Sequence, residues 1–193
     1  MKTIFSAKAL HIVLALIMVS SFSLPGPASG RRDPLTSDEV DKLREATQDP
    51  DIRLHLLVTF ANARLQSALQ LKTSTKPPED RAHQIHALLE DFNAIVEELE
   101  DNLDMYTRQR AVFKKAMKEI VPAYADWQSK LRGLKPAGTE TGTATAEYRQ
   151  FEFVLTTSLE TVDAGADSAR TLNEQQQKLA EDVKHRKKEE SKR

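Results

Sequence analysis

The chain has 193 residues, enough for one domain, and it contains no cysteine, which excludes disulfides, thiol chemistry and c-type haem attachment. Charged residues make up 30% of the chain and aromatic residues only 6%, a balance typical of long helices rather than of sheets. The formal net charge is −1 and becomes −3 without Lys2 and Lys8, so the sequence does not predict a nucleic-acid-binding protein.

Residues 1–30 have the pattern of a secretory signal peptide. Two lysines precede an apolar run over residues 10–19, and small residues follow it. We expect cleavage after Ala28 or Gly30. The run is shorter than the roughly 20 residues that span a bilayer, so we expect no stable membrane span after cleavage. The absence of cysteine and of an N-glycosylation motif favours a bacterial envelope, with the mature protein periplasmic or secreted.

The mature chain begins with two helical segments. Thr36 and Glu39 are spaced as a capping box, which predicts a helix from there to about Gln48. Asp49 and Pro50 then end this helix and start a second one, which runs to about Leu71. The second helix is apolar on two sides, which favours burial between other helices. In the alternative, its second stripe is an interface for a partner or another copy, formed by Ile52, Leu56 and Phe60.

A seven-residue repeat organises the centre of the chain. Its positions are all apolar or aromatic: Ile85, Phe92, Leu99, Tyr106, Phe113, Ile120, Trp127 and Leu134. An unbroken repeat predicts one continuous helix from Glu79 to Leu134, bent at Pro122. The predicted fold is therefore all-α, an elongated antiparallel bundle of three long arms with coiled-coil-like packing, the first arm broken at Pro50. The alternative breaks the central helix between Asn102 and Arg110 and gives a compact four-helix bundle.

A loop over residues 136–146 leads to the last predicted helix, from Glu147 to Val183. The domain therefore covers residues 31–183. Its final helix has small residues in the middle, including Gly165, where neighbours can approach closely. Residues 184–193 are rich in lysine and arginine and lack an apolar anchor, so we expect a disordered basic tail.

The apolar seam weakens at one level, which we call the polar waist. Folding the arms back about their turns places polar residues of the three arms at similar heights: Asn102, Gln109, Arg110, Asn173 and Gln176. In this prediction Asn102 lies opposite Asp49, and Gln109 lies beside Leu172. Such a layer fixes the register of helices, and it also offers groups that a small polar ligand would bind.

His83, His86 and Glu90 recur at three and four residues, so they share one side of a helix, as metal ligands on helices do. The same line continues through acidic residues on the side away from the apolar seam. A solvated acidic face is the simpler interpretation, and weak cation binding is the alternative.

No motif for a nucleophile, a phosphate loop or paired inward carboxylates is present, so we expect neither an enzyme nor a bound cofactor. The sequence favours a non-catalytic interaction or scaffolding protein that binds an unknown protein partner or a second copy of itself. An acidic segment, residues 82–107, and the basic tail are charged surfaces suited to such contacts. The alternative is a helical bundle that binds a cation or a small ligand.

Overall fold

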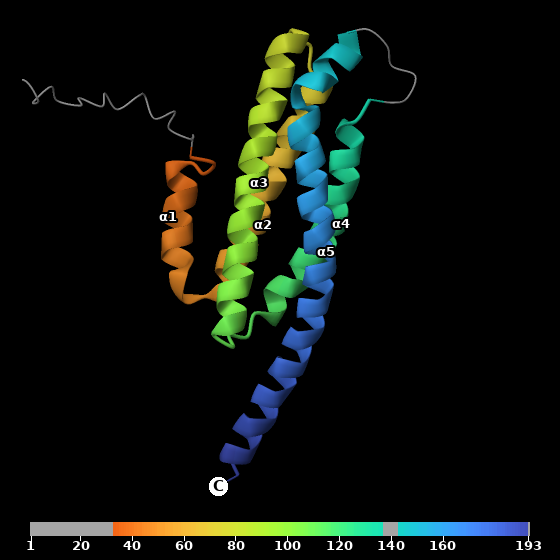
Figure 1. The fold of residues 1–193 in the computed structure, drawn as a ribbon. Helices are drawn as coiled ribbons and strands as arrows, with labels where there is room; N and C mark the ends of the chain where they lie inside the picture. The colour runs from red at the N-terminus through yellow and green to blue at the C-terminus, as the bar shows by residue number, and fades with distance from the viewer. Residues whose placement is uncertain (1–32, 137–142, 193) are drawn as a thin grey trace, which may run out of the picture. The chain divides into compact units, whose positions relative to one another are not determined.

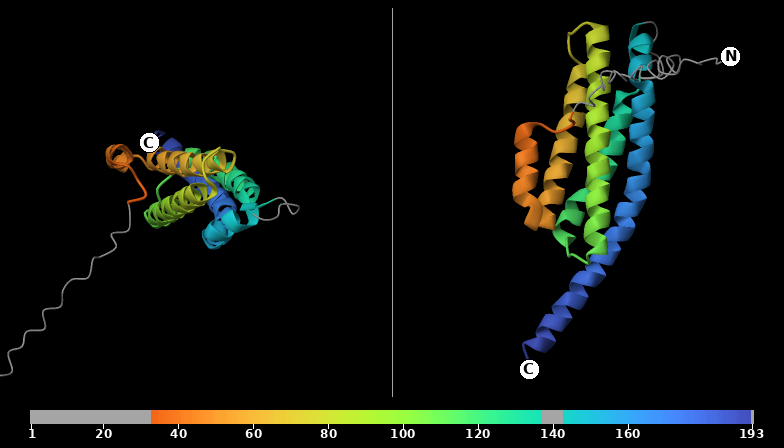
Figure 2. Two further views of the ribbon diagram at one scale, coloured as in Figure 1. Left: turned by 90° about the horizontal axis from the view of Figure 1, so that it is seen from above. Right: turned by 60° about the vertical axis from the view of Figure 1, so that its left-hand side comes forward.

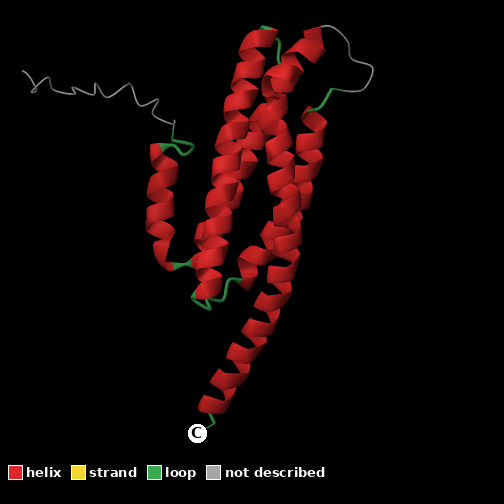
Figure 3. Ribbon diagram, viewed as in Figure 1, coloured by secondary structure: helices red, strands yellow, loops and turns green. Residues whose placement is uncertain are grey.

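A computed structural model describes residues 33–136 and 143–192, and all regular structure within these ranges is helical (Figure 3). The predicted signal peptide and most of the predicted loop after Pro136 lie outside the described residues. The all-helical bundle predicted from the sequence is confirmed.

The first helix, α1 (Ser37–Glu45), begins with the predicted capping box, in which Thr36 Oγ1 accepts from the Glu39 N–H and the Glu39 side chain accepts from the Thr36 N–H. A short 3₁₀ turn, η1 (Ala46–Gln48), follows. Asp49 then caps α2 (Pro50–Lys72), its side chain accepting from the Ile52 N–H at 3.2 Å. Both boundaries agree with the sequence prediction because local capping residues set them.

The predicted continuous central helix is wrong. It is divided into α3 (Pro78–Arg108) and α4 (Lys114–Leu134), which run in opposite directions (Figure 1). The α3 helix ends at Arg108 with Gln109 as its C-cap, and Arg110 adopts a left-handed conformation with φ of 55°. The alternative prediction, a four-helix bundle with a break in this region, is therefore the correct one. The α4 helix continues through Pro122 without a break.

The last helix, α5 (Thr143–Glu190), is longer than predicted at both ends. Residues 184–190, expected to be disordered, continue the helix with their side chains exposed. Lysine and glutamate are good helix formers, and a helix already formed extends at low cost. Lys187 and Lys188 in the last turn also interact favourably with the helix dipole.

Helices α2 to α5 form a four-helix bundle around one core. Helix α2 packs against α3 and α4, and α5 packs against α3 and α4, so α3 and α4 lie diagonally across the bundle (Figures 1 and 2). Every residue of the central seven-residue repeat is buried, and Phe92 and Tyr124 each pack edge-on against Trp127, with ring centroids 5.5 and 5.0 Å away. Helix α1 lies outside the four, against α2.

Candidate functional site

The end of the bundle where α3 gives way to α4 holds a partly buried polar network centred on Arg53. From the first turn of α2, this guanidinium donates to Asn102 Oδ1 at 2.7 Å, to the Leu43 carbonyl at 2.9 Å and to Glu98 Oε1 at 2.9 Å. The Asn102 amide in turn donates to the carbonyl and to the side chain of Glu98. Arg53 therefore joins α1, α2 and α3 at a single point.

At the same end of the bundle, Gln176 of α5 forms hydrogen bonds with backbone groups of the segment between α3 and α4. Its side chain is 2% exposed, accepts from the Phe113 N–H at 2.9 Å and donates to the Ala111 carbonyl at 3.2 Å. Asp51 of α2 accepts from the Ala116 N–H at 2.7 Å, in the first turn of α4. These hydrogen bonds satisfy backbone N–H and C=O groups that a helix terminus leaves without partners.

The structure brings together only part of the predicted polar waist. Asn102 and Gln176 are buried and hydrogen-bonded, although Asn102 meets Arg53, one turn further along α2 than predicted. Gln109 caps α3 and is exposed, and Arg110 is an exposed turn residue that acts through its backbone, so neither is a buried lining residue as predicted. Asn173 is partly buried, and its side chain makes no hydrogen bond to another described residue.

Beside the Arg53 network the surface is hollowed by a cleft of about 460 Å³, which we call the joint cleft. It lies between η1, the start of α2 and the last turns of α3. Its lining is mostly polar: Thr47, Arg53, Glu98, Asp101, Asn102, Met105, Tyr106 and Gln109.

Tyr106 differs from the other residues that line the joint cleft. It is 5% exposed, yet its hydroxyl makes no hydrogen bond to any residue in the described part of the chain. Burial raises its pKa above 10.0; Arg53 opposes the rise, and the charges of Asp49 and Glu98 add to it. The hydroxyl is therefore protonated at neutral pH and is free both to donate and to accept.

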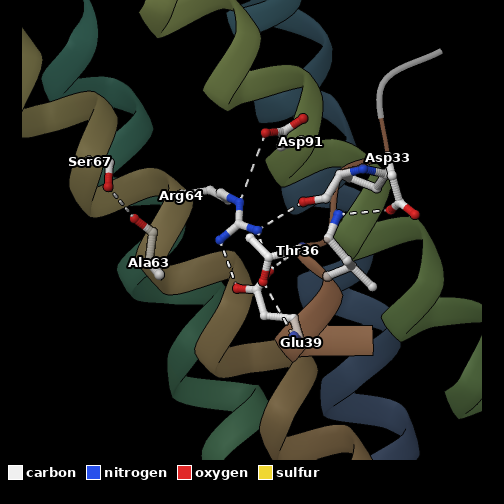
Figure 4. Close-up of polar contacts among 9 residues, drawn as sticks. Asp33, Thr36, Glu39, Ala63, Arg64, Ser67 and Asp91 are labelled. Atoms are coloured by element: carbon white, nitrogen blue, oxygen red, sulfur yellow. Dashed lines mark hydrogen bonds and ion pairs between the residues drawn. The ribbon is translucent and has the colours of Figure 1, made fainter. Parts of the chain in front are cut away.

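A second arginine of α2, Arg64, anchors the other end of α1 (Figure 4). It donates to both carboxylate oxygens of Glu39 at 2.9 and 2.5 Å and to the Pro34 carbonyl at 2.9 Å, and its Nε lies 3.9 Å from Asp91 of α3. Burial opposes ionisation of Glu39, but hydrogen bonds from Arg64 and from the Thr36 N–H outweigh it and lower the Glu39 pKa. Two arginines thus fasten α1 to the bundle at both of its ends.

The residues predicted as metal ligands do not form a centre. His86 Nδ1 lies 3.6 Å from Glu90 Oε2 in an exposed pair, and His83 is exposed on the same helix. Within residues 33–136 and 143–192, no group of three or more histidine, aspartate and glutamate side chains is placed to hold a metal ion. One helix alone presents these side chains, whereas bundle metal sites draw ligands from several.

The predicted interface stripe on α2 is divided. Phe60 is 5% exposed and belongs to the core, so it is not available as an interface residue. Leu56 is partly buried and packs against the core, and Ile52 alone is exposed, at 51%. Helix α1 explains the second apolar side of α2, because Leu43 joins the same buried cluster as Phe60.

Sequence reasoning missed a groove between α3 and α5. Two adjoining hollows of about 340 and 470 Å³ share Asp104, Ser168 and Leu172, and Glu100 lies in the first of them. We call this surface the acidic groove; no lysine or arginine in the described ranges lines it, although Arg108 and Arg170 pair with Asp104 and Asp167 at its rim. The signal in the sequence was a run of acidic residues on α3 facing small residues on α5.

Glu100 lies in this groove, in surroundings that disfavour the charged form of its carboxyl group. Burial raises its pKa above 4.5; the hydrogen bond from the Tyr124 hydroxyl, 3.1 Å long, opposes the rise, and neighbouring Asp104, Glu97 and Asp101 add to it. A cationic group placed nearby would relieve both the burial and the repulsion, because it favours the charged form of the carboxyl.

The carboxyl-terminal part of α5 runs past the ends of the other helices (Figures 1 and 2). In this projecting part, residues 177–190, no side chain makes a hydrogen bond or ion pair to another described helix. At 100° per residue, Leu179 and Arg186 continue the line on α5 that passes through Ser168 and Gln175 of the acidic groove.

None of the described helices has the length and apolar character needed to cross a membrane. A comparison with protein-family models, with curated proteins and with solved structures finds no match for this chain.

Proposed function

We propose that this protein is an exported, non-catalytic helical bundle that acts by self-association, with α5 as the contact element. One observation supports the proposal. In the projecting part of α5, Leu179 and Arg186 lie on the same side of the helix as the residues of α5 that line the acidic groove. The second copy is the proposed occupant of that groove.

The two complementary surfaces cannot meet within one molecule. Arg186 and Ser168 are 18 residues apart on one helix, a separation of about 27 Å along its axis. A rigid helix keeps them apart, so the basic end reaches an acidic groove only in another copy.

An antiparallel arrangement of two α5 helices satisfies both contacts at once. When Arg186 of one copy lies at Ser168 of the other, Leu179 meets Gln175 and the reverse contacts form by symmetry. Such a twofold interface closes on itself rather than continuing into a fibre. The shared segment is short and its rim is charged, so we expect association in the micromolar range that weakens with salt.

Charge reversal tests this arrangement. Arg186→Asp should weaken dimerisation about tenfold, measured by analytical ultracentrifugation of residues 31–193, and so should Asp104→Arg. Combining the two should restore association, because the reversed charges are again complementary. The control is Lys184→Asp, on the opposite side of α5, which should have a smaller effect. A wild-type monomer at high concentration and low salt would refute self-association, and failure of the double variant to recover would refute this pairing.

Export rests on the sequence pattern of residues 1–30. If the protein is exported from a bacterial host, mass spectrometry of the purified product should find the chain shortened to a start after Ala28 or Gly30. A full-length product recovered from the cytoplasm would contradict export and would leave the self-association proposal to be judged by its own experiment.

A further inference from the structure

The joint cleft offers several hydrogen-bond acceptors that no described residue uses. Arg53 already spends three of its N–H groups within the protein, and Glu98 Oε1 already accepts from Arg53 and Asn102. The acceptors that remain toward the cleft are the second Glu98 oxygen, the Asp101 carboxylate and the Tyr106 hydroxyl, beside the two further N–H groups of Arg53 and the side-chain amide of Gln109.

The charge of the cleft is also unbalanced. The Arg53 charge is matched by Glu98, with which it forms an ion pair at 2.9 Å. Asp101 lines the same cleft and has no ion pair with a described lysine, arginine or histidine. The lining therefore carries one uncompensated negative charge, which favours a singly charged cation.

Tyr106 is the second, independent sign of a ligand. A tyrosine that is 5% exposed normally directs its hydroxyl to a partner, and this one has none in the described chain. Its ring packs against Phe113, 6.2 Å away between centroids, which fixes the side chain in place. The ring is therefore buried and held in place, while the hydroxyl opens onto the joint cleft and is available to bond a ligand there.

We infer that the joint cleft binds a small organic cation through a primary ammonium group. The ammonium donates to the Asp101 carboxylate, to the free Glu98 oxygen and to the Tyr106 hydroxyl, which matches its three N–H donors. The carbon chain of the ligand lies along Met105, the apolar member of the lining. Asp101 also borders the acidic groove, so the two sites adjoin at this residue, but neither proposal requires the other.

The test uses three probes of equal length and different charge: n-butylammonium, n-butanol and n-butyrate. Each is titrated into isotopically labelled protein, and backbone amide signals are followed by NMR. Because so small a ligand binds weakly, in the millimolar range, NMR is the suitable method. Only n-butylammonium should give saturable shifts, and these should centre on Asn102 and Tyr106. Equal shifts from n-butanol, or no saturable shift from n-butylammonium, would overturn the inference.

Two variants locate the binding groups. Asp101→Asn should weaken n-butylammonium binding about tenfold, and Tyr106→Phe about threefold. Tyr106→Phe should leave the thermal midpoint unchanged, since the hydroxyl has no hydrogen-bond partner among the residues that the structure describes. The control is Asp104→Asn, one turn away on α3, which lines the acidic groove and not this cleft. If Asp104→Asn weakens binding as much as Asp101→Asn, general surface charge explains the binding and the assigned site is wrong.

Discussion

Arg110 shows how one residue ends a helix without the usual signals. The Ala111 N–H donates to the Tyr106 carbonyl and the Arg110 N–H donates to the Thr107 carbonyl, the two bonds of a Schellman motif. The motif needs a left-handed residue, normally glycine, and here it is Arg110 with φ of 55°. A side chain at this backbone conformation is strained by about 1 kcal/mol.

We therefore predict that Arg110→Gly stabilises the protein by about 1 kcal/mol, because glycine adopts this conformation without steric cost. Chemical denaturation of the variant and the wild type measures the difference. The matched control is Gln109→Gly at the preceding residue, whose φ is −76°; it should be neutral or destabilising. A loss of stability in Arg110→Gly would mean that the arginine side chain contributes more than its backbone strain costs.

Gly165 permits the close approach of α5 to α3 and α4. A Cβ at this position would lie 2.6 Å from Glu100 Oε1 and 2.7 Å from Tyr124 Cζ, and the tyrosine ring is fixed in the core. The glycine thus shapes the floor of the acidic groove.

Replacing Gly165 by alanine should destabilise the protein by about 1–3 kcal/mol, since the helices would have to separate to accommodate the methyl group. Gly133→Ala in α4 is the control. Its Cβ would meet Leu69 at an ordinary 3.8 Å, so alanine should be neutral or stabilising by up to about 1 kcal/mol. The comparison is made by urea denaturation, and equal effects of both substitutions would contradict the steric explanation.

At the scale of elements, α1 is attached by charge as much as by apolar packing. Arg53 binds its carboxyl-terminal end through the Leu43 carbonyl, and Arg64 binds its amino-terminal end through Glu39. The two arginines are eleven residues apart, about three helical turns, so both point from the same side of α2. Apolar periodicity revealed the second stripe of α2, but these polar anchors leave no periodic signal.

The Glu39 anchor should depend on pH. Its folded-state pKa is below the ordinary value of 4.5, so the stability from ionised Glu39 is complete above about pH 4.5 and is lost as the pH falls through the folded-state pKa. Glu39→Gln should lower the free energy of unfolding by about 2 kcal/mol at neutral pH. This deficit should shrink in acid, where the wild-type carboxyl is also neutral.

The measurement is the free energy of unfolding of wild type and Glu39→Gln from neutral pH down to about pH 3. Glu45→Gln is the control, because Glu45 is exposed on the same helix and its side chain has no hydrogen bond or ion pair to a described residue. A Glu39→Gln deficit that stays constant across this range would show that the carboxylate does not stabilise α1 through its charge.

At the scale of the whole molecule, the chain direction around the helix break decides the architecture. The repeat passes from Tyr106 to Phe113 without a change of phase, although residues 109–113 reverse the chain. Both residues are buried, one at the end of α3 and the other just before α4. The periodicity of a sequence indicates which side of each helix is buried. The same periodicity is expected for one continuous helix and for two helices that fold back on each other.

The sequence by itself determined the all-helical class, the capping of α1 and α2, and the buried positions of the central repeat, because local hydrogen bonds and helical periodicity depend on residues close in the chain. Only the tertiary structure decided the break at Arg110, the diagonal placement of α3 and α4, and the partners of Arg53, Arg64 and Gly165. The joint cleft and the acidic groove belong to this second group. They join residues from separate helices, and their positions depend on the register of those helices in three dimensions.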